Sequence, residues 1–274
     1  MLHVIATPIG NLGDLSPRAL EAFKSASLIA CEDTRRTLQL LNHFEIRKPL
    51  ISCHQHNERA RAEEICSLLQ EGKEIVYVSD AGMPGISDPG ALLVQACLEK
   101  NLPCTVVPGA SAVLTAAVLS GLPAQPFSFY GFLSRNGKNR QKELETIRSL
   151  NHLVILYESP YRIQATLSDL LRVLGDVPCT VLRELTKLHE EAKTGSLSEL
   201  IPQYENPPKG ECVICVLPKG EVPSDSSSSP EDWIRSHNGS FRSVRDLAQA
   251  ASEACAVSKR EAYQIALSIS SENK

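Results

Sequence analysis

Three short segments rich in glycine, serine and proline follow apolar runs in the first half of the chain: 8–13 (PIGNLG), 79–85 (SDAGMPG) and 108–111 (PGAS). Glycine lets a backbone approach a ligand closely and present its N–H and C=O groups. Each segment alone is equally typical of an ordinary strand-to-helix connection. Together, at one edge of a sheet, they predict a small cofactor held by main-chain groups. None has the G-x-G-x-x-G spacing of a dinucleotide site.

Basic side chains gather in other segments that follow predicted strands. Those that we single out as candidate nucleic-acid contacts are Arg35, Arg36, Arg135, Lys138 and Arg140. Cations in such positions can neutralise phosphates, although a basic loop is more often simply solvated. The formal net charge of −4 argues against wholesale binding of polyanions and leaves room for a local basic face.

Two further patterns have the spacing of metal or redox sites. Cys212 and Cys215 form a C-x-x-C pair, but residues three apart on a strand point to opposite faces. No second pair completes a zinc site, and His54 with His56 lacks an evident third ligand. We therefore expect no metal. G-x-S-x-G, Walker and H-E-x-x-H motifs are absent, which removes the commonest hydrolase, nucleotide-hydrolysing and zinc-protease classes.

The composition is that of an ordinary globular protein, with 274 residues, 42% apolar and 22% charged. Nine cysteines, an odd number, lie mostly inside apolar segments. The first residues lack the basic region and cleavage site of a signal peptide, and no run approaches the roughly 20 apolar residues of a membrane span. We expect reduced, buried thiols, a cytoplasmic location and no membrane association.

Apolar runs predict the elements that carry these segments. Strands are expected at residues 3–7, 28–31, 50–54, 75–78, 105–107, 127–132, 153–157, 179–182 and 212–217. Helix starts are predicted at Ser16-Pro17, Asp33 and Asp88-Pro89, and Ser196 with Glu199 has capping-box spacing. The run at 75–78 is continuous rather than alternating, which indicates a strand buried on both faces. Strands that alternate with helices predict an α/β fold with a parallel sheet.

Changes in composition divide the chain into four parts. Residues 121–126 (GLPAQP) form a candidate hinge between an N-terminal α/β lobe, 1–121, and a second α/β lobe, 122–219, with fewer helices and a more mixed sheet. Residues 220–230 read as a linker. Amphipathic helices in 231–274 predict a small helical module, which is marginal as an independent fold.

Seven segments, taken in order, resemble one family. They are 6–14 (ATPIGNLGD), 31–35 (CEDTR), 79–82 with 87–90 (SDAG and SDPG), 108–111 (PGAS), 157–160 (YESP), 183–187 (RELTK) and 209–211 (KGE). Each is weak alone, but seven in sequence are specific. They look like the ribosomal RNA small subunit methyltransferase I family, whose members have the tetrapyrrole-methylase fold. The resemblance covers about residues 2–217, and the terminal helices resemble that family's C-terminal extension.

This resemblance implies a two-lobed homodimer that binds S-adenosylmethionine between its lobes. It implies methylation of the ribose 2′-hydroxyl of a cytidine in the decoding region of 16S rRNA, with the small ribosomal subunit as partner. By motif position, the cofactor residues are Pro8, Ser79, Asp80, Ala81, Gly82, Ser111, Ala112, Gly131, Glu184 and Leu185. Met83 stands where the family usually has threonine, and Gly85 where it usually has a bulkier aliphatic residue.

A ribose hydroxyl is a poor nucleophile, so a general base would help the transfer. Glu158, Glu184 and Lys187 lie at predicted strand ends and are the candidates for that role. The alternative for each is a structural or cofactor-binding role.

Two other functions remain open. A corrinoid or tetrapyrrole methylase with this fold predicts an apolar acceptor pocket and has no need of the RELTK segment, the basic loop or the terminal helices. A non-catalytic RNA-binding factor of ribosome assembly predicts that S-adenosylmethionine does not bind.

Overall fold

The computed structural model describes residues 1–220, 229–238, 241, 243–255 and 257–272. They form two compact units, one of Met1–Ile147 with His152–Pro218 and one of Arg148–Asn151 with Lys219–Lys274. Most of the predicted linker, 220–230, lies outside the described residues. Each unit is considered by itself.

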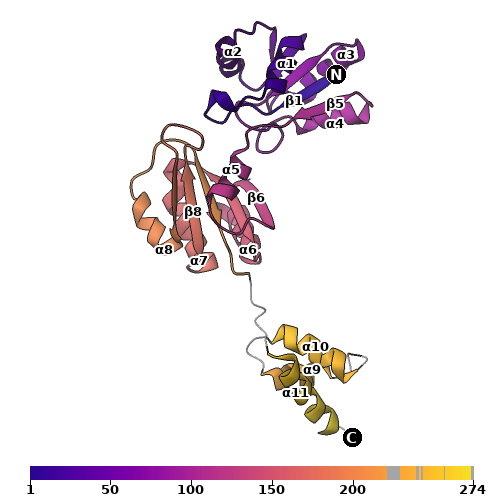
Figure 1. The fold of residues 1–274 in the computed structure, drawn as a ribbon, viewed down its shortest axis with the longest axis vertical. Coiled ribbons are helices and arrows are strands. Elements are labelled where there is room, and N and C mark those ends of the chain that lie inside the picture. The colour runs from indigo at the N-terminus through magenta and orange to yellow at the C-terminus, as the bar shows by residue number, and fades with distance from the viewer. Residues whose placement is uncertain (221–228, 239–240, 242, 256, 273–274) are drawn as a thin grey trace. The chain divides into compact units, whose positions relative to one another are not determined.

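The first sheet of the larger unit, which includes the strands labelled β1 and β5 in Figure 1, has five parallel strands. Their order across the sheet is β3 (Leu50–Ser52), β2 (Leu28–Cys31), β4 (Ile75–Val78), β1 (Leu2–Ile5) and β5 (Cys104–Val107). Every pairing is parallel, which confirms the α/β prediction. Parallel strands put all their carboxyl ends at the same edge of the sheet, so the loops that follow β1 and β4 are neighbours.

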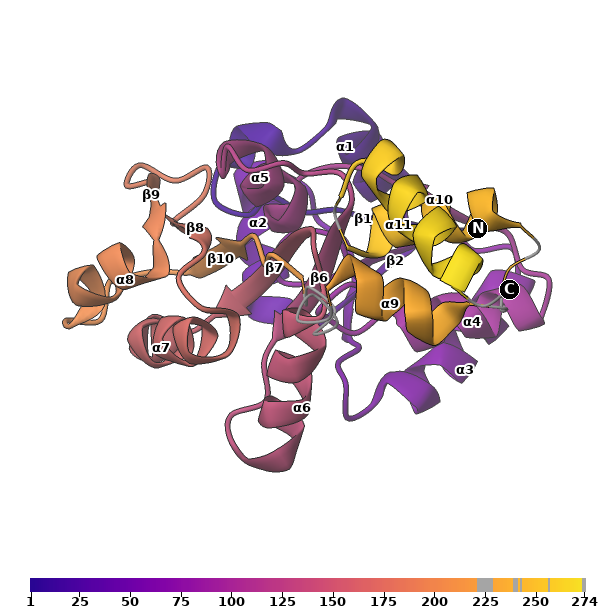
Figure 2. The ribbon, with the colours of Figure 1, turned by 90° about the horizontal axis from the view of Figure 1, so that it is seen from below.

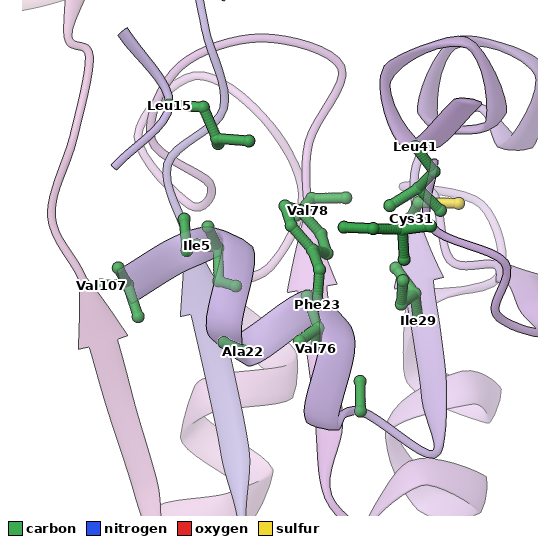
Figure 3. Close-up of a cluster of buried hydrophobic side chains, with 13 residues drawn as sticks. Ile5, Leu15, Ala22, Phe23, Ile29, Cys31, Leu41, Val76, Val78 and Val107 are labelled. Carbon is green, nitrogen blue, oxygen red and sulfur yellow. The ribbon is translucent and has the colours of Figure 1, made fainter. Parts of the chain in front are cut away.

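Helices cover both faces of this sheet. Val76 and Val78 of β4 join the cluster with Phe23 from α1 (Pro17–Ser25) and Leu41 from α2 (Thr34–His43), as Figure 3 shows. The alternate residues of β4 pack instead with α3 (Glu58–Gln70) and α4 (Ala91–Glu99). Burial on both sides explains why the sequence of β4 is continuously apolar.

The second sheet is mixed, as predicted. Its order is β6 (Phe127–Phe132), β7 (Leu153–Glu158), β10 (Cys212–Val216), β8 (Pro178–Arg183) and β9 (Glu191–Ser196), which Figure 2 shows in succession. β6 and β7 are parallel, and the other pairs are antiparallel. The sequence did not predict β9, because this edge strand is half-exposed and carries no apolar run.

One helix of small residues, α5 (Ala112–Leu119), ties the first sheet to the second. It follows β5, yet its buried Val113, Ala116 and Ala117 pack against β7 and β10. In Figure 2, α5 lies on one side of the second sheet and α7 (Ile163–Leu174) on the other. The remaining helical elements of this unit are η1 (Leu12–Asp14), α6 (Gly137–Arg148), η2 (Pro160–Arg162), α8 (Leu197–Leu200) and η3 (Ile201–Tyr204).

Three predicted helix caps are confirmed. Ser16 accepts a hydrogen bond from the N–H of Ala19 at the start of α1, with Pro17 at the first helical position. Asp33 accepts the N–H of Arg35 at the start of α2. Ser196 and Glu199 form a complete capping box on α8.

The predicted helix start at Asp88-Pro89 is wrong. α4 begins at Ala91, and Gly90 occupies the N-cap position with a φ of 128°. The acceptor comes from α3 instead, because a carboxylate oxygen of the buried Glu58 takes the N–H of Gly90 at 2.7 Å and that of Leu92 at 3.1 Å. Asp88 therefore does not cap α4.

The described residues of the smaller unit form three helices, α9 (Pro230–His237), α10 (Val244–Ala254) and α11 (Lys259–Glu272). Their buried faces share one apolar cluster, made of Ile234, Leu247, Ala248, Ala251, Ala262, Ala266 and Ile269. Among the described residues, no helix combines the length and the apolar composition that crossing a membrane requires.

We expect Gly90→Ala to lower the free energy of unfolding by about 2–3 kcal/mol, because a φ of 128° strains any side chain and the new Cβ would lie 2.5 Å from the Tyr77 ring. The measurement is the midpoint of urea unfolding. Gly72→Ala is the matched control: it also has a positive φ, but nothing lies within 4 Å of its Cβ, so about 1 kcal/mol is expected. Equal losses would contradict the role of Tyr77.

Candidate active site

A cavity of about 490 Å³ lies in the larger unit beside the ends of several strands. Its lining comes from the loop after β4 (residues 80–88), from the start of α5, from the carboxyl ends of β6 and β7 and from the amino end of β10. Two of the three glycine-containing segments, 79–85 and 108–111, thus meet at one place, and Ile9 brings in the third.

A short backbone bridge holds two of these segments together. The N–H of Thr7 donates to the carbonyl of Gly82 at 2.9 Å, and the N–H of Gly82 donates to the carbonyl of Thr7 at 3.0 Å. Gly82 has a φ of 75°, which an L side chain rarely adopts, and a Cβ there would lie 3.3 Å from Ile9. The bridge therefore fixes the loop, and the missing side chain keeps its surface open to the cavity.

Asp80 joins this loop to the segment after β2. Its carboxylate accepts the N–H of Asp33 at 3.0 Å and pairs with the guanidinium of Arg36 at 3.4 Å. In return, the N–H of Asp80 donates to the carboxylate of Glu32. Asp80 consequently organises the wall of the cavity as well as lining it.

The cavity carries several carboxyl groups. Burial raises the pKa of Glu32, and the neighbouring Asp80 and Asp88 raise it further. Burial also raises the pKa of Asp88, opposed by a hydrogen bond from Ser79 and reinforced by Asp80. Carboxylates that repel one another in a partly desolvated site attract a cationic ligand.

The cofactor residues predicted from the sequence fall into two groups. Asp80, Ala81, Gly82, Ser111 and Ala112 line the cavity. The others do not line it: Pro8, Ser79, Gly131, Glu184 and Leu185.

Among the three candidate bases, Glu158 alone lines the cavity. Its carboxylate is almost fully buried and is already a multiple acceptor. One oxygen takes the N–H of Ser159 at 2.8 Å and lies 3.4 Å from the guanidinium of Arg162; the other takes the hydroxyl of Thr166 at 2.6 Å. Glu158 therefore holds together the end of β7, η2 and α7.

Glu184 and Lys187 do not line the cavity, but they form an ion-pair cluster with Glu211, which does. The ammonium of Lys187 donates to Glu184 at 2.9 Å and to Glu211 at 2.8 Å. The hydrogen bond from Lys187 lowers the pKa of Glu184. Burial lowers the pKa of Lys187, but the hydrogen bonds that Lys187 donates to Glu211 and Glu184 raise that pKa overall. Lys187 is consequently protonated at neutral pH.

The predicted basic residues differ in exposure. Arg35 pairs with Asp33, Arg36 lines the cavity with its side chain 63% exposed, and Arg135 and Lys138 are exposed. The prediction that Arg140 lies in an exposed loop is wrong, because α6 begins at Gly137 and turns this residue inward.

The buried Arg140 guanidinium donates to Asp169 at 2.9 Å, to the carbonyl of Ser134 at 3.1 Å and to the hydroxyl of Thr166 at 3.0 Å. A buried cation needs such a full set of partners. Its role in this structure is to hold the segment that follows β6.

Several lining residues were not predicted as site residues, and four of them have side chains that bear on the chemistry: Glu32, Asp88, Phe132 and Tyr157. Three of them lie inside the motif segments or next to a strand end, so position relative to the strands was a usable signal. Phe132 had no signal beyond being the last residue of a predicted strand. Among the described residues, no group of three or more histidine, cysteine, aspartate or glutamate side chains is placed to hold a metal ion.

Comparisons with known proteins agree with this geometry. The family model described as Tetrapyrrole (Corrin/Porphyrin) Methylases matches residues 1–201. The chain is 44% identical to the ribosomal RNA small subunit methyltransferase I of Synechocystis sp., over 98% of each protein, and 45% identical to that of Thermotoga maritima, over 80% of this chain and 98% of the relative.

A solved structure shares the fold at low identity. Uroporphyrin-III C-methyltransferase from Thermus thermophilus, complexed with S-adenyl homocysteine, superposes with a TM-score of 0.56 at 17% identity, over 80% of this chain and 97% of that one. On the family model and the close relatives together, the chain belongs to the tetrapyrrole methylase family and, within it, to the ribosomal RNA small subunit methyltransferase I family.

Proposed function

We propose that this protein transfers a methyl group from S-adenosylmethionine to the ribose 2′-hydroxyl of a cytidine in the decoding region of 16S rRNA. The observation that carries the proposal is a cavity where the glycine-containing loops meet, in a chain whose relatives are named as small-subunit rRNA methyltransferases over nearly its whole length. The substrate would be the small ribosomal subunit or its RNA.

The cavity has the properties that S-adenosylmethionine requires. Its volume lies within the roughly 300–1,000 Å³ of small-molecule sites. Asp80, Ala81, Gly82, Ser111 and Ala112 would hold the cofactor, and Glu32 with Asp88 supplies negative charge for a cation. The related fold from Thermus thermophilus was solved with S-adenyl homocysteine. When bound, the cofactor supplies an activated methyl group on a positively charged sulfur.

The protein's own contribution to such a displacement is mainly positioning and exclusion of water. Of the three candidate bases, the cavity position supports Glu158, while protonation of Lys187 argues against that residue at neutral pH. Contacts to RNA phosphates are supported by Arg36, which lines the cavity. Three exposed basic residues lie close in sequence to lining segments and support the same role: Arg35, Arg135 and Lys138.

We also propose that the protein is a homodimer. Apart from Thr115, every residue of α5 is apolar, and its Leu114 and Val118 are exposed. Exposed apolar side chains gathered on one helix are typical of an interaction surface.

The reaction itself is tested with methyl-labelled S-adenosylmethionine and small ribosomal subunits, followed by mapping of the labelled nucleotide. We expect one labelled cytidine in the decoding region, with the label on the ribose. Labelling of a tetrapyrrole offered in the same assay would favour a corrinoid-type methylase. No labelling, with S-adenosylmethionine left unbound by folded protein, would favour a non-catalytic RNA-binding factor.

Gly82→Val is expected to reduce the affinity for S-adenosylmethionine at least tenfold, because the side chain would fill the cavity wall and cannot easily adopt a φ of 75°. Isothermal calorimetry measures this directly. Gly85→Val is the control: its φ of 79° imposes similar strain, but Gly85 does not line the cavity and a Cβ there has only ordinary contacts. Unchanged affinity in Gly82→Val would show that the cofactor lies elsewhere.

The acidic lining predicts a pH dependence. Because the pKa values of Glu32 and Asp88 are raised, these groups become neutral earlier on acidification than ordinary carboxyls do. Lowering the pH from 7.5 towards 5 should therefore weaken the binding of S-adenosylmethionine, which has the sulfonium charge, more than the binding of S-adenosylhomocysteine, which lacks it. Calorimetry with both ligands gives the difference, and Asp88→Asn should reduce it. Parallel pH curves for the two ligands would exclude this electrostatic contribution.

A further inference from the structure

Two aromatic side chains stand exposed at the carboxyl ends of β6 and β7. Phe132, the last residue of β6, lines the cavity with 59% of its surface exposed. Tyr161 is 83% exposed and follows Pro160, which also lines the cavity. Exposed rings beside a concave site call for an explanation, since burying them would be favourable.

Strand pairing places the two rings at the same edge of the sheet. β6 and β7 are parallel neighbours, and Phe132 lies opposite Tyr157 in the register. Tyr161 comes four residues after Tyr157, in the helical turn η2 that continues β7. Both aromatic residues therefore leave the sheet where the cavity opens.

A β-bulge determines which way Phe132 points. The register skips Tyr130, since Phe129 pairs with Ile155 and Gly131 with Leu156. Residues three apart on a regular strand face opposite sides, but one extra residue returns them to the same side. Accordingly, the rings of both Phe129 and Phe132 pack edge-on against Tyr157, at centroid distances of 4.8 and 5.7 Å.

Hydrogen bonds from neighbouring side chains fix the backbone of the segment after Phe132. The Arg162 guanidinium donates to the carbonyl of Leu133 at 3.1 Å, and Arg140 donates to that of Ser134 at the same distance. The N–H and hydroxyl of Ser134 both donate to Glu143, at 2.8 and 2.7 Å. These bonds fix the backbone next to Phe132 without using its side chain.

The same network reaches Tyr161. Arg162, its neighbour in η2, lies 3.4 Å from Glu158, whose other oxygen accepts the hydroxyl of Thr166. Arg140 donates to that same Thr166 hydroxyl. One connected set of bonds thus fixes the backbone next to both exposed aromatic residues, and rigid placement before binding lowers the entropy cost of recognition.

We propose that Phe132 and Tyr161 form an aromatic platform on which the base of the target nucleotide, or of its immediate neighbour, stacks while the ribose is presented to the cavity. This proposal rests on the proposed function. Sequence-specific proteins commonly read unpaired RNA bases by stacking them on aromatic side chains. Arg36, exposed on the same cavity, supplies the positive charge that an adjoining phosphate needs.

The experiment measures initial rates of methyl transfer against the concentration of small ribosomal subunits, together with S-adenosylmethionine affinity by calorimetry. We expect Phe132→Ala and Tyr161→Ala each to lower kcat/KM for the subunit by about 5- to 150-fold, the range for loss of one stacked base. Cofactor affinity and melting temperature should stay near those of the wild type. Phe132→Trp and Tyr161→Phe keep an aromatic face and should restore most of the rate.

Phe127→Ala is the matched control. Phe127 begins the same strand, is 40% exposed and does not line the cavity, so its loss should leave the rates unchanged. Wild-type rates in both Phe132→Ala and Tyr161→Ala would overturn the platform while leaving the proposed function intact. An equal loss in Phe127→Ala, or a loss of cofactor affinity in the platform variants, would also overturn it. A wild-type protein that methylates no RNA refutes the proposed function, and the platform with it.

Discussion

The pair of backbone hydrogen bonds between Thr7 and Gly82 is the interaction on which the candidate site depends. It joins the loops that leave β1 and β4, two central neighbours of a parallel sheet. The sheet brings these loops to one edge, but only a direct bond fixes their spacing. Asp80 extends the same arrangement to the segment after β2 through the N–H of Asp33. The cavity wall is consequently part of the sheet's hydrogen-bonded framework rather than a loop attached to it.

Much of the fold could be predicted from the sequence, because burial on both faces imposes continuous apolar strands that alternate with helices. The failures have physical causes. β9 is a polar edge strand, so no apolar pattern in the sequence predicts its pairing with β8. At Asp88-Pro89 the local capping preference is overridden by the carboxylate of Glu58, which is thirty residues away in the chain. Local rules cannot anticipate an acceptor that only tertiary packing supplies.

The site was predictable where it is made of backbone and less so where it is made of charged side chains. Glycine and small residues mark the loop 79–82 directly. By contrast, Arg135 and Arg140 lie five residues apart in a basic stretch, yet one is exposed and the other is buried against Asp169. The difference arises because α6 begins between them. Likewise, Glu158 ends β7 and Glu184 directly follows β8. Only the tertiary structure shows that Glu158 lines the cavity and that Glu184 belongs to an ion-pair cluster.

The extra residue in β6 has an evolutionary consequence. Side chains on a strand alternate, so the face to which a strand's last residue belongs depends on whether the number of residues before it is odd or even. Because Tyr130 is left unpaired, the face on which Phe132 lies does not follow from the regular pairing of Phe127, Ser128 and Phe129 with β7. Gain or loss of one residue there would exchange the side chain that lines the cavity while preserving the core beneath it. The bulge thereby separates the choice of the residue at the cavity from the packing of the strand below it.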